Sequence, residues 1–175
     1  NTQTRAIAIG ATFLALVLSL YFFFTFNSLL NEYQFRLRLP WVPSLGISYH
    51  VGLDGNGVVM VLLHAILSFS GALISRSIGQ NVRLYFVFYL VLVASIFGVF
   101  TSLDLFLLYF FYEMAVIPLY PLIGMWGSQN REYASMKLTL YISLGAVVAL
   151  VGLLALYFAS GLKTFDLIEL SQSVK

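Results

Sequence analysis

Residues 103–126 read LDLFLLYFFYEMAVIPLYPLIGMW, and this stretch decides the fold. A helix needs roughly 20 mostly apolar residues to cross a bilayer core of about 30 Å, and the stretch is long enough to do so. It carries one acid deep inside the run, Glu113, followed by Pro118 and Pro121. The stretch therefore predicts a transmembrane helix with a carboxyl group inside the membrane.

The composition of the whole chain agrees with a membrane protein. Its 175 residues are 61% hydrophobic and 9% charged, and the mean hydropathy is +0.94. A soluble domain is about 45–50% apolar and about 25% charged, so a soluble enzyme, a nucleic-acid binder and a disordered chain are excluded. The net charge of +2 is too small to indicate an anionic partner. Without cysteine, the chain has no thiolate metal site and no cysteine-held iron–sulfur cluster.

The chain contains further apolar runs of similar length, separated by polar connections. The predicted spans are 6–30, 57–75, 84–101, 103–126 and 134–160, with an extramembrane loop over 31–56. Pro40 and Pro43 would break a helix in that loop. The runs are continuous rather than alternating, which disfavours a membrane barrel. We therefore expect an all-α integral membrane protein with about five transmembrane helices, forming a single membrane domain over residues 1–175.

Basic residues predict the orientation, because the loops that hold lysine and arginine stay on the cytoplasmic side. The 76–83 and 127–133 connections are basic, whereas the 101–103 turn has no cation. This places the N-terminus on the cytoplasmic or matrix side and the 31–56 loop outside. One side then carries Arg5, Arg76, Arg83, Arg131 and Lys137, and the other carries Arg36, Arg38, Lys163 and Lys175.

Glu113 is the strongest candidate for chemistry. A charged group at the centre of a membrane helix costs about 2.5–3.5 kcal/mol on insertion scales. Positions 109, 110, 116 and 117 of the same helix are Tyr, Phe, Val and Ile, so no neighbour there can neutralise it. Burial favours the protonated form of a carboxyl group. A group that gains and loses a proton at this depth suits proton translocation, and the alternative is a structural carboxyl bonded to another helix.

Three further residues are candidates for supporting roles. Pro118 removes a backbone hydrogen bond and frees a carbonyl about one turn earlier, near Glu113, so we expect helix distortion there. Lys137 lies about one turn into its span and either reaches inward as a possible relay or snorkels to the headgroups. His64 is a possible relay, since histidine changes charge near neutral pH, or a packing residue. Small residues that follow it, including Ser68 and Gly71, favour helix–helix contact.

No sequence motif indicates a cofactor in this chain. The sequence holds no phosphate-binding loop, no GxGxxG and no metal-ligand constellation. We therefore expect no cofactor and no metal here, and no nucleic-acid partner.

Two stretches resemble a known family. Residues 110–127, FFYEMAVIPLYPLIGMWG, are similar to the antiporter-like membrane subunits of respiratory complex I, above all subunit M of bacteria and subunit 4 of mitochondria. Residues 41–55, WVPSLGISYHVGLDG, resemble the loop ahead of the third helix of that subunit. The first signature is shared with sodium/proton antiporters and membrane-bound hydrogenases, whereas the loop favours the complex I branch. Together the resemblance covers roughly residues 40–160.

The resemblance implies that Glu113 is the family's glutamate of helix five, which takes part in proton translocation. The family's subunits have about fourteen helices, so this chain would correspond to helices two to six. The family's lysine partner lies on helix seven and would be absent. The resemblance also places FMN, iron–sulfur clusters and quinone in partner subunits, so the enzyme label belongs to the assembly.

Three functions remain open from the sequence. The first is a proton-translocating subunit of NADH–quinone oxidoreductase in the respiratory electron-transport chain, packed among other membrane subunits and lipid. Its membrane would be the bacterial or archaeal cytoplasmic membrane or the mitochondrial inner membrane. The second is a subunit of a sodium/proton antiporter or membrane-bound hydrogenase. The third is a membrane scaffold that transports nothing.

Overall fold

Five long helices follow the apolar runs of the sequence. The computed structural model describes residues 2–30 and 32–173 of the chain. The helices are α1 (Thr2–Thr25), α2 (Gly55–Ile74), α3 (Val82–Thr101), α4 (Leu105–Trp126) and α5 (Arg131–Ser160). Each is long and apolar enough to cross a membrane. The predicted fold class is confirmed. Lys175, which was assigned above to the outer side, lies outside the described residues.

The first helix is shorter than predicted. It ends at Thr25, whereas the apolar run continues to residue 30. Asn27 explains the difference, because its side-chain oxygen accepts a hydrogen bond of 3.0 Å from the backbone N–H of Leu29. Such a local bond turns the chain in place of a further helical turn.

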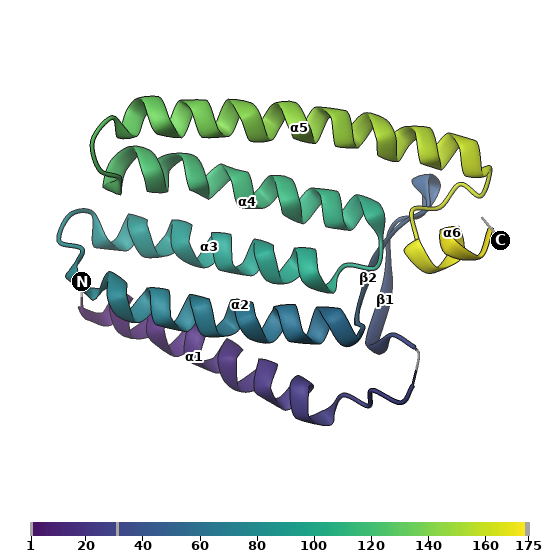
Figure 1. The fold of residues 1–175 in the computed structure, drawn as a ribbon, viewed down its shortest axis with the longest axis horizontal. Helices are drawn as coiled ribbons and strands as arrows, with labels where there is room; N and C mark the ends of the chain where they lie inside the picture. The colour runs from purple at the N-terminus through teal and green to yellow at the C-terminus, as the bar shows by residue number, and fades with distance from the viewer. Residues whose placement is uncertain (1, 31, 174–175) are drawn as a thin grey trace.

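Aspartates fix the starts of two helices. The Asp54 carboxylate accepts a hydrogen bond of 2.6 Å from the N–H of Gly57 at the start of α2. Asp104 accepts bonds from the N–H groups of Phe106 and Leu107, at 3.0 and 3.1 Å, and so caps α4. A cap satisfies backbone donors that the first helical turn leaves free. Both caps lie at the same end of the helices (Figure 1).

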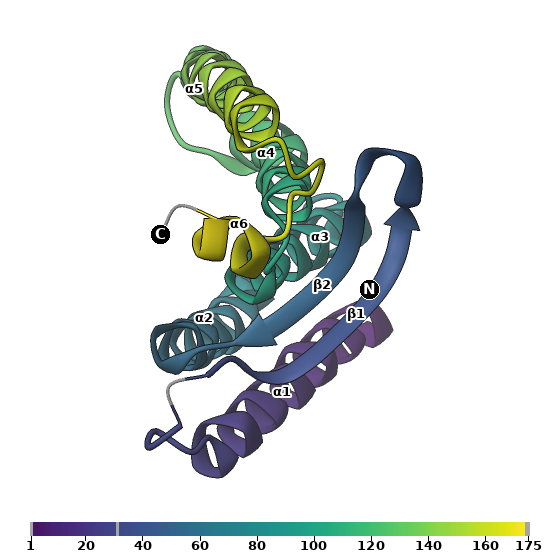
Figure 2. The same ribbon diagram turned by 90° about the vertical axis from the view of Figure 1, so that its right-hand side faces the viewer.

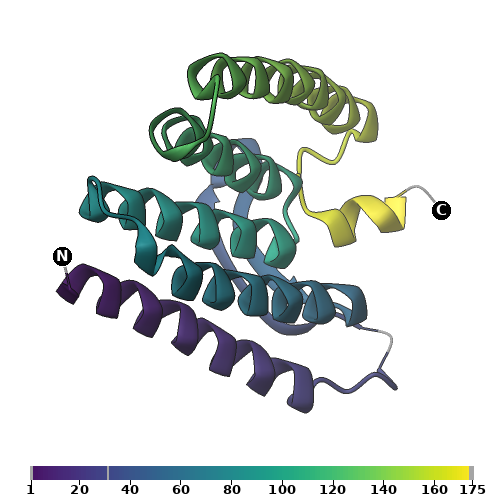
Figure 3. The ribbon, with the colours of Figure 1, turned by 60° about the vertical axis from the view of Figure 1, so that its left-hand side comes forward.

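The helices form a curved row rather than a closed bundle (Figures 1 and 3). Helix α4 packs between α3 and α5, and α1 packs against α2 and α3. A small core of Ala8, Val82 and Phe86 joins α1 to α3. Only 6% of the most apolar window of α5 is buried. The exposed apolar faces therefore require lipid or other protein around them.

A β-hairpin lies across one end of the row (Figure 2). Strands β1 (Gln34–Val42) and β2 (Ile47–Leu53) pair antiparallel, and a short 3-10 turn, η1 (Pro43–Leu45), joins them. The hairpin lies within residues 31–56, for which an extramembrane loop without strands was predicted. At the same end, the tail after α5 forms a short helix, α6 (Leu167–Ser173). At the opposite end, a 3-10 turn, η2 (Ser75–Ser77), follows α2.

Gly46 ends the turn of the hairpin in a conformation that favours glycine. Its φ is +69°, and the carbonyl of Lys163 occupies the place that a Cβ atom would take. A side chain here would be strained by the left-handed backbone and would also collide with the segment after α5. Gly46 therefore allows the hairpin and that segment to approach closely.

Gly46→Ala is expected to destabilise this end of the protein. The left-handed conformation alone costs an L-residue on the order of 1–2 kcal/mol, and the clash with Lys163 adds to it. The measurement is the thermal unfolding midpoint of the purified protein in detergent. Gly10→Ala is the control, because no atom lies within 4 Å of its would-be Cβ. Equal midpoints for the two variants would contradict the prediction.

Two buried aspartates, Asp104 and Asp166, join the hairpin to the helix ends. Together with their partners Ser48 and His50, we call them the hairpin junction. The Asp104 carboxylate accepts bonds from the N–H and hydroxyl of Ser48, at 2.9 and 3.1 Å. The Asp166 carboxylate lies 2.7 Å from Nδ1 of His50 and caps α6 through the N–H of Ile168 at 2.9 Å. Both aspartates are almost fully buried. The junction therefore connects β2 with the starts of α4 and α6.

Candidate proton site

Glu113 lies inside α4, about nine residues from the start of the helix. Its Oε1 atom is shielded from solvent and has no hydrogen-bond partner among the described residues. The hydroxyl of Tyr109, one turn earlier, interacts with the carboxyl group. A buried polar atom without a partner is rare in proteins and calls for a functional explanation. Here it leaves one oxygen of the carboxyl free to take a proton.

Glu113 faces the neighbouring helix α5. Gly124 lies roughly three turns further along α4, so the two residues project from the same side. A Cβ at Gly124 would lie 3.3 Å from the hydroxyl of Ser135 on α5. In α5, the buried residues are Ser135 and Ala146, which mark the side facing α4. Because the two helices run antiparallel, Ala146 lies at about the depth of Glu113.

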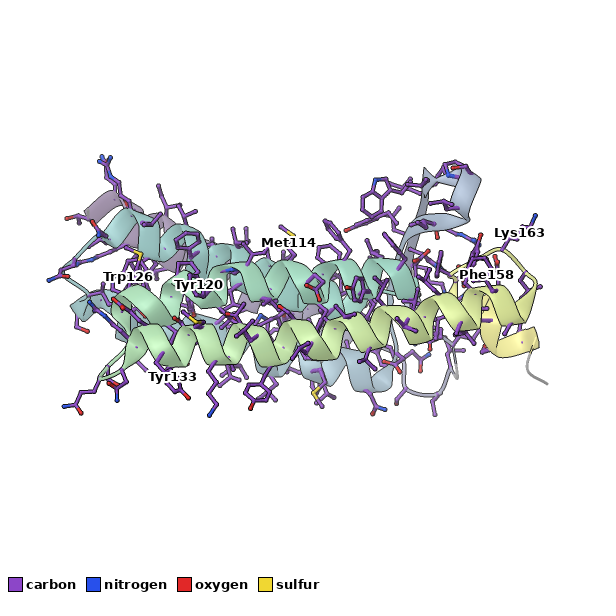
Figure 4. The ribbon with its side chains drawn as sticks, turned by 90° about the horizontal axis from the view of Figure 1, so that it is seen from above. Met114, Tyr120, Trp126, Tyr133, Phe158 and Lys163 are labelled. Carbon is purple, nitrogen blue, oxygen red and sulfur yellow. The ribbon has the colours of Figure 1, made fainter. Side chains whose placement is uncertain are left out.

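Pro118 stands within α4 between Glu113 and the Gly124 contact. The helix continues through both Pro118 and Pro121 to Trp126. Pro118 has no N–H, so the carbonyl of Met114 lacks its usual helical partner. Met114 follows Glu113 directly and lies along the middle of α4 (Figure 4). A free carbonyl next to the carboxyl supplies a second polar group at this depth.

Lys137 lies on the opposite side of α5 from this site. It follows Ser135 by two residues, which turns it by about 200° away from the side facing α4. Its ammonium group is exposed and lies 5.7 Å from the ring centre of Tyr133 and 6.0 Å from that of Tyr141. The structure thus does not bring Lys137 and Glu113 together. Its proposed relay or supporting role stays a prediction.

His64 belongs to a different interface. Its Nε2 atom lies 3.1 Å from the backbone oxygen of Val93, between α2 and α3. Its ring contacts Phe97 with centroids 4.6 Å apart. Glu113 and His64 lie at similar depths but in separate helix pairs, so the sequence alone could not show whether they meet.

The hairpin junction escaped the sequence analysis. Neither the buried contact of Asp104 with Ser48 nor the buried pairing of His50 with Asp166 was predicted from the sequence. The signal was weak because the two residues are 116 positions apart. An acid directly before an apolar helix indicates a cap, whereas its second partner on a strand follows only from the tertiary structure.

Comparison with known proteins places this geometry in a family. The family described as "NADH:quinone oxidoreductase/Mrp antiporter, TM" matches residues 102–174. Complex I from Thermus thermophilus contains a chain of the same fold, with a TM-score of 0.83 and 28% identity over 95% of this chain and 34% of that chain. A membrane-bound sulfane sulfur reductase from an archaeal complex shares the fold with a TM-score of 0.73 at 22% identity. Residues 102–174 thus match this family, and nearly the whole chain is similar to a membrane subunit of complex I.

The relatives of the chain are subunits named M or chain 4. NADH-quinone oxidoreductase subunit M of Rickettsia typhi is 33% identical over 95% of this chain and 34% of its own length. NAD(P)H-quinone oxidoreductase chain 4-2 of Synechocystis is 34% identical over 96% of this chain and 30% of its own length. F(420)H(2) dehydrogenase subunit M of Methanosarcina mazei is 33% identical over 97% of this chain and 36% of its own length. The chain spans about a third of the length of these relatives.

Proposed function

We propose that this chain is part of a proton-translocating membrane subunit of a respiratory NADH–quinone oxidoreductase, with Glu113 as its switchable proton site. The observation that carries the proposal is the shielded Oε1 of Glu113, which has no partner among the described residues. The match of residues 102–174 to the antiporter-like family supports it, as does the named activity of the relatives in Rickettsia and Synechocystis.

The chemistry at the site is a proton transfer. Glu113 takes a proton on its free carboxyl oxygen and becomes neutral, which suits its apolar surroundings. The Tyr109 hydroxyl interacts with the carboxyl group, and the Met114 carbonyl, freed by Pro118, is a further polar group on the same helix. Release of the proton returns the carboxylate, which is costly in the membrane unless a cation approaches. Proton uptake and release at Glu113 are thereby coupled to the charges around it.

The partners and the orientation are part of the proposal. FMN, iron–sulfur clusters and quinone would be held by other subunits, because no redox motif occurs in this sequence. The N-terminus would lie on the cytoplasmic or matrix side, because the connections at that end are basic, with Arg76, Arg83 and Arg131. The hairpin would then lie on the outer side of the membrane.

Proteoliposomes that contain the complex test this function. Supply of NADH and quinone is expected to drive proton movement across the vesicle membrane, followed with a pH-sensitive dye. A protonophore should abolish the signal, and a sodium ionophore should not, because the carboxyl chemistry transfers a proton. Proton movement that depends on added sodium, or that occurs without a redox substrate, would instead indicate a sodium/proton antiporter.

A further inference from the structure

The exposed side of α5 carries a lysine between two tyrosines. The Lys137 ammonium lies 5.7 Å from the ring centre of Tyr133 and 6.0 Å from that of Tyr141, which stand one turn to either side. These residues line a shallow hollow of about 310 Å³ together with Met136 and Leu140. We call the five residues the lysine hollow.

The lysine hollow lies on a surface that no described helix covers. Helix α5 stands at the edge of the row, and its extensive packing is with α4 (Figure 1). Tyr133 lies at the start of α5, near the loop that follows Trp126 (Figure 4). Tyr133 and Tyr141 are each 67% exposed. The lysine hollow therefore faces the surroundings of the described part of the protein.

Lys137 marks the edge of the apolar part of α5. Residues 138–160 contain no charged side chain. At 1.5 Å per residue they span about 34 Å, which is close to the bilayer core of about 30 Å. Lys137 therefore lies where the acyl chains meet the headgroups, at the end of the helices that also carries Arg76, Arg83 and Arg131.

No ion pair balances the charge of Lys137 within the described part of the protein. The one acid in α5, Glu132, precedes it by five residues and so points about 140° away around the helix. Arg131 is directed elsewhere, because its guanidinium donates to the backbone oxygen of Met125 at 2.8 Å. The lysine hollow thus presents one unbalanced cation to its surroundings.

The polar groups of the lysine hollow suit a phosphate. A lysine ammonium has three donors, and each tyrosine hydroxyl can donate one more. Phosphate oxygens accept such bonds, and the positive charge of the ammonium strengthens them. A protein acid would have to be brought to this boundary by another helix, whereas the phosphates of lipids already lie at this depth.

Exposed apolar side chains continue from the lysine hollow toward the middle of the membrane. They follow the same side of α5 as Lys137, at intervals of three to four residues. Each is more than 60% exposed, and the series is Tyr141, Leu144, Val148 and Val151. This surface suits the acyl chains of a lipid whose headgroup is bound at Lys137.

We propose that the lysine hollow binds the phosphate headgroup of an anionic phospholipid in the leaflet on the basic side. The Lys137 ammonium bonds the phosphate, the Tyr133 hydroxyl adds a second donor, and the acyl chains lie along the exposed side of α5. The binding forms no covalent bond and transfers no proton. It is independent of Glu113 and of the proposed proton-translocating function.

Photocrosslinking in the whole complex tests the site. Leu140, which lines the lysine hollow, is replaced by the photoreactive p-benzoylphenylalanine. The complex is then reconstituted in vesicles of phosphatidylcholine with a minor share of phosphatidylglycerol. Mass spectrometry of the α5 peptides compares the two lipid adducts with the composition of the vesicle. Only complex that a native gel shows to be assembled is counted.

Phosphatidylglycerol adducts are expected to exceed the share of that lipid in the vesicle by about fivefold, which corresponds to about 1 kcal/mol for one cation near an anionic surface. Lys137→Gln should reduce them to the vesicle share, and Lys137→Arg should keep the enrichment. Lys163→Gln is the matched control, because it removes an equal charge from an exposed position beyond the other end of α5 and should leave the enrichment unchanged.

Three results would overturn the proposal. Adducts at the vesicle share with Lys137 intact would show that α5 contacts lipid without selecting it. Adducts with a peptide of another segment or subunit would show that protein covers the lysine hollow. Enrichment that persists in Lys137→Gln would exclude Lys137 as its cause. If that variant fails to assemble, 1 M salt replaces it, where the screening length is about 3 Å: a fall in enrichment supports the site, and unchanged enrichment contradicts it.

Discussion

Glu113→Gln is expected to abolish proton pumping linked to quinone reduction, while the complex still assembles. Glutamine has the shape of glutamate and keeps a polar contact for Tyr109, but it cannot bind and release a proton. The amide also fits the apolar surroundings of α4 without a charge. Proton movement in proteoliposomes measures the effect, together with quinone reduction in the same vesicles and a native gel for assembly.

Glu113→Asp is the matched control for that variant. It keeps a titratable carboxyl and shortens the side chain by one methylene, so part of the pumping should return. Wild-type pumping in Glu113→Gln would contradict the proton role. Altered assembly or stability with intact coupling would instead identify Glu113 as a structural carboxyl and the chain as a scaffold.

Asp166→Ala is expected to give the largest loss of stability. The carboxylate is only 1% exposed, and its Oδ2 lies 2.7 Å from Nδ1 of His50 and 3.5 Å from the Arg38 guanidinium. Removal of the carboxylate leaves the buried His50 without its hydrogen-bond partner and the first turn of α6 without its cap. A buried polar group that loses its hydrogen-bond partner typically costs about 1–3 kcal/mol, and more where the group is charged. The measurement is the thermal unfolding midpoint of the purified complex, with the amount of assembled complex in the membrane.

Glu169→Ala is the control for the hairpin junction. Glu169 also binds Arg38, at 2.9 Å, but both side chains are nearly half exposed. That hydrogen bond, with the charge of Asp166, raises the pKa of Arg38 despite its partial burial, so Arg38 stays cationic. Exposed ion pairs contribute only about 0.2–1 kcal/mol. A loss in Glu169→Ala as large as in Asp166→Ala would contradict the role of the buried pair.

The long helices could be predicted because membrane spans are defined by length and composition within one continuous stretch. The helix α4 and the place of Glu113 within it followed directly from residues 103–126. The orientation of Lys137 was also accessible, since Ser135 and Ala146 repeat at helical spacing and exclude Lys137 from their side. It was missed because depth was considered without the position around the helix.

The hairpin and its attachment were less accessible. Residues 35–39, FRLRL, alternate as a strand does, but Pro40 and the polar surroundings favoured a loop. The pairing of His50 with Asp166 depends on the packing of β2 against the segment after α5, which no local pattern contains. The contact between Tyr89 and the Ser68 backbone oxygen was missed for the same reason, since the two residues lie on different helices.

The hairpin junction also constrains the order in which the parts of the protein can fold during synthesis. Strand β2 is synthesised early, yet its His50 is held by Asp166, 116 residues later. At a translation rate of about 5–20 residues per second, this interval lasts roughly 6–23 s. During that time the hairpin has no anchor from α6 and is held by earlier contacts, among them the packing of Leu53 on α2 and the Ser48 bond to Asp104. The hairpin junction is therefore completed only after the whole of α5 has been synthesised.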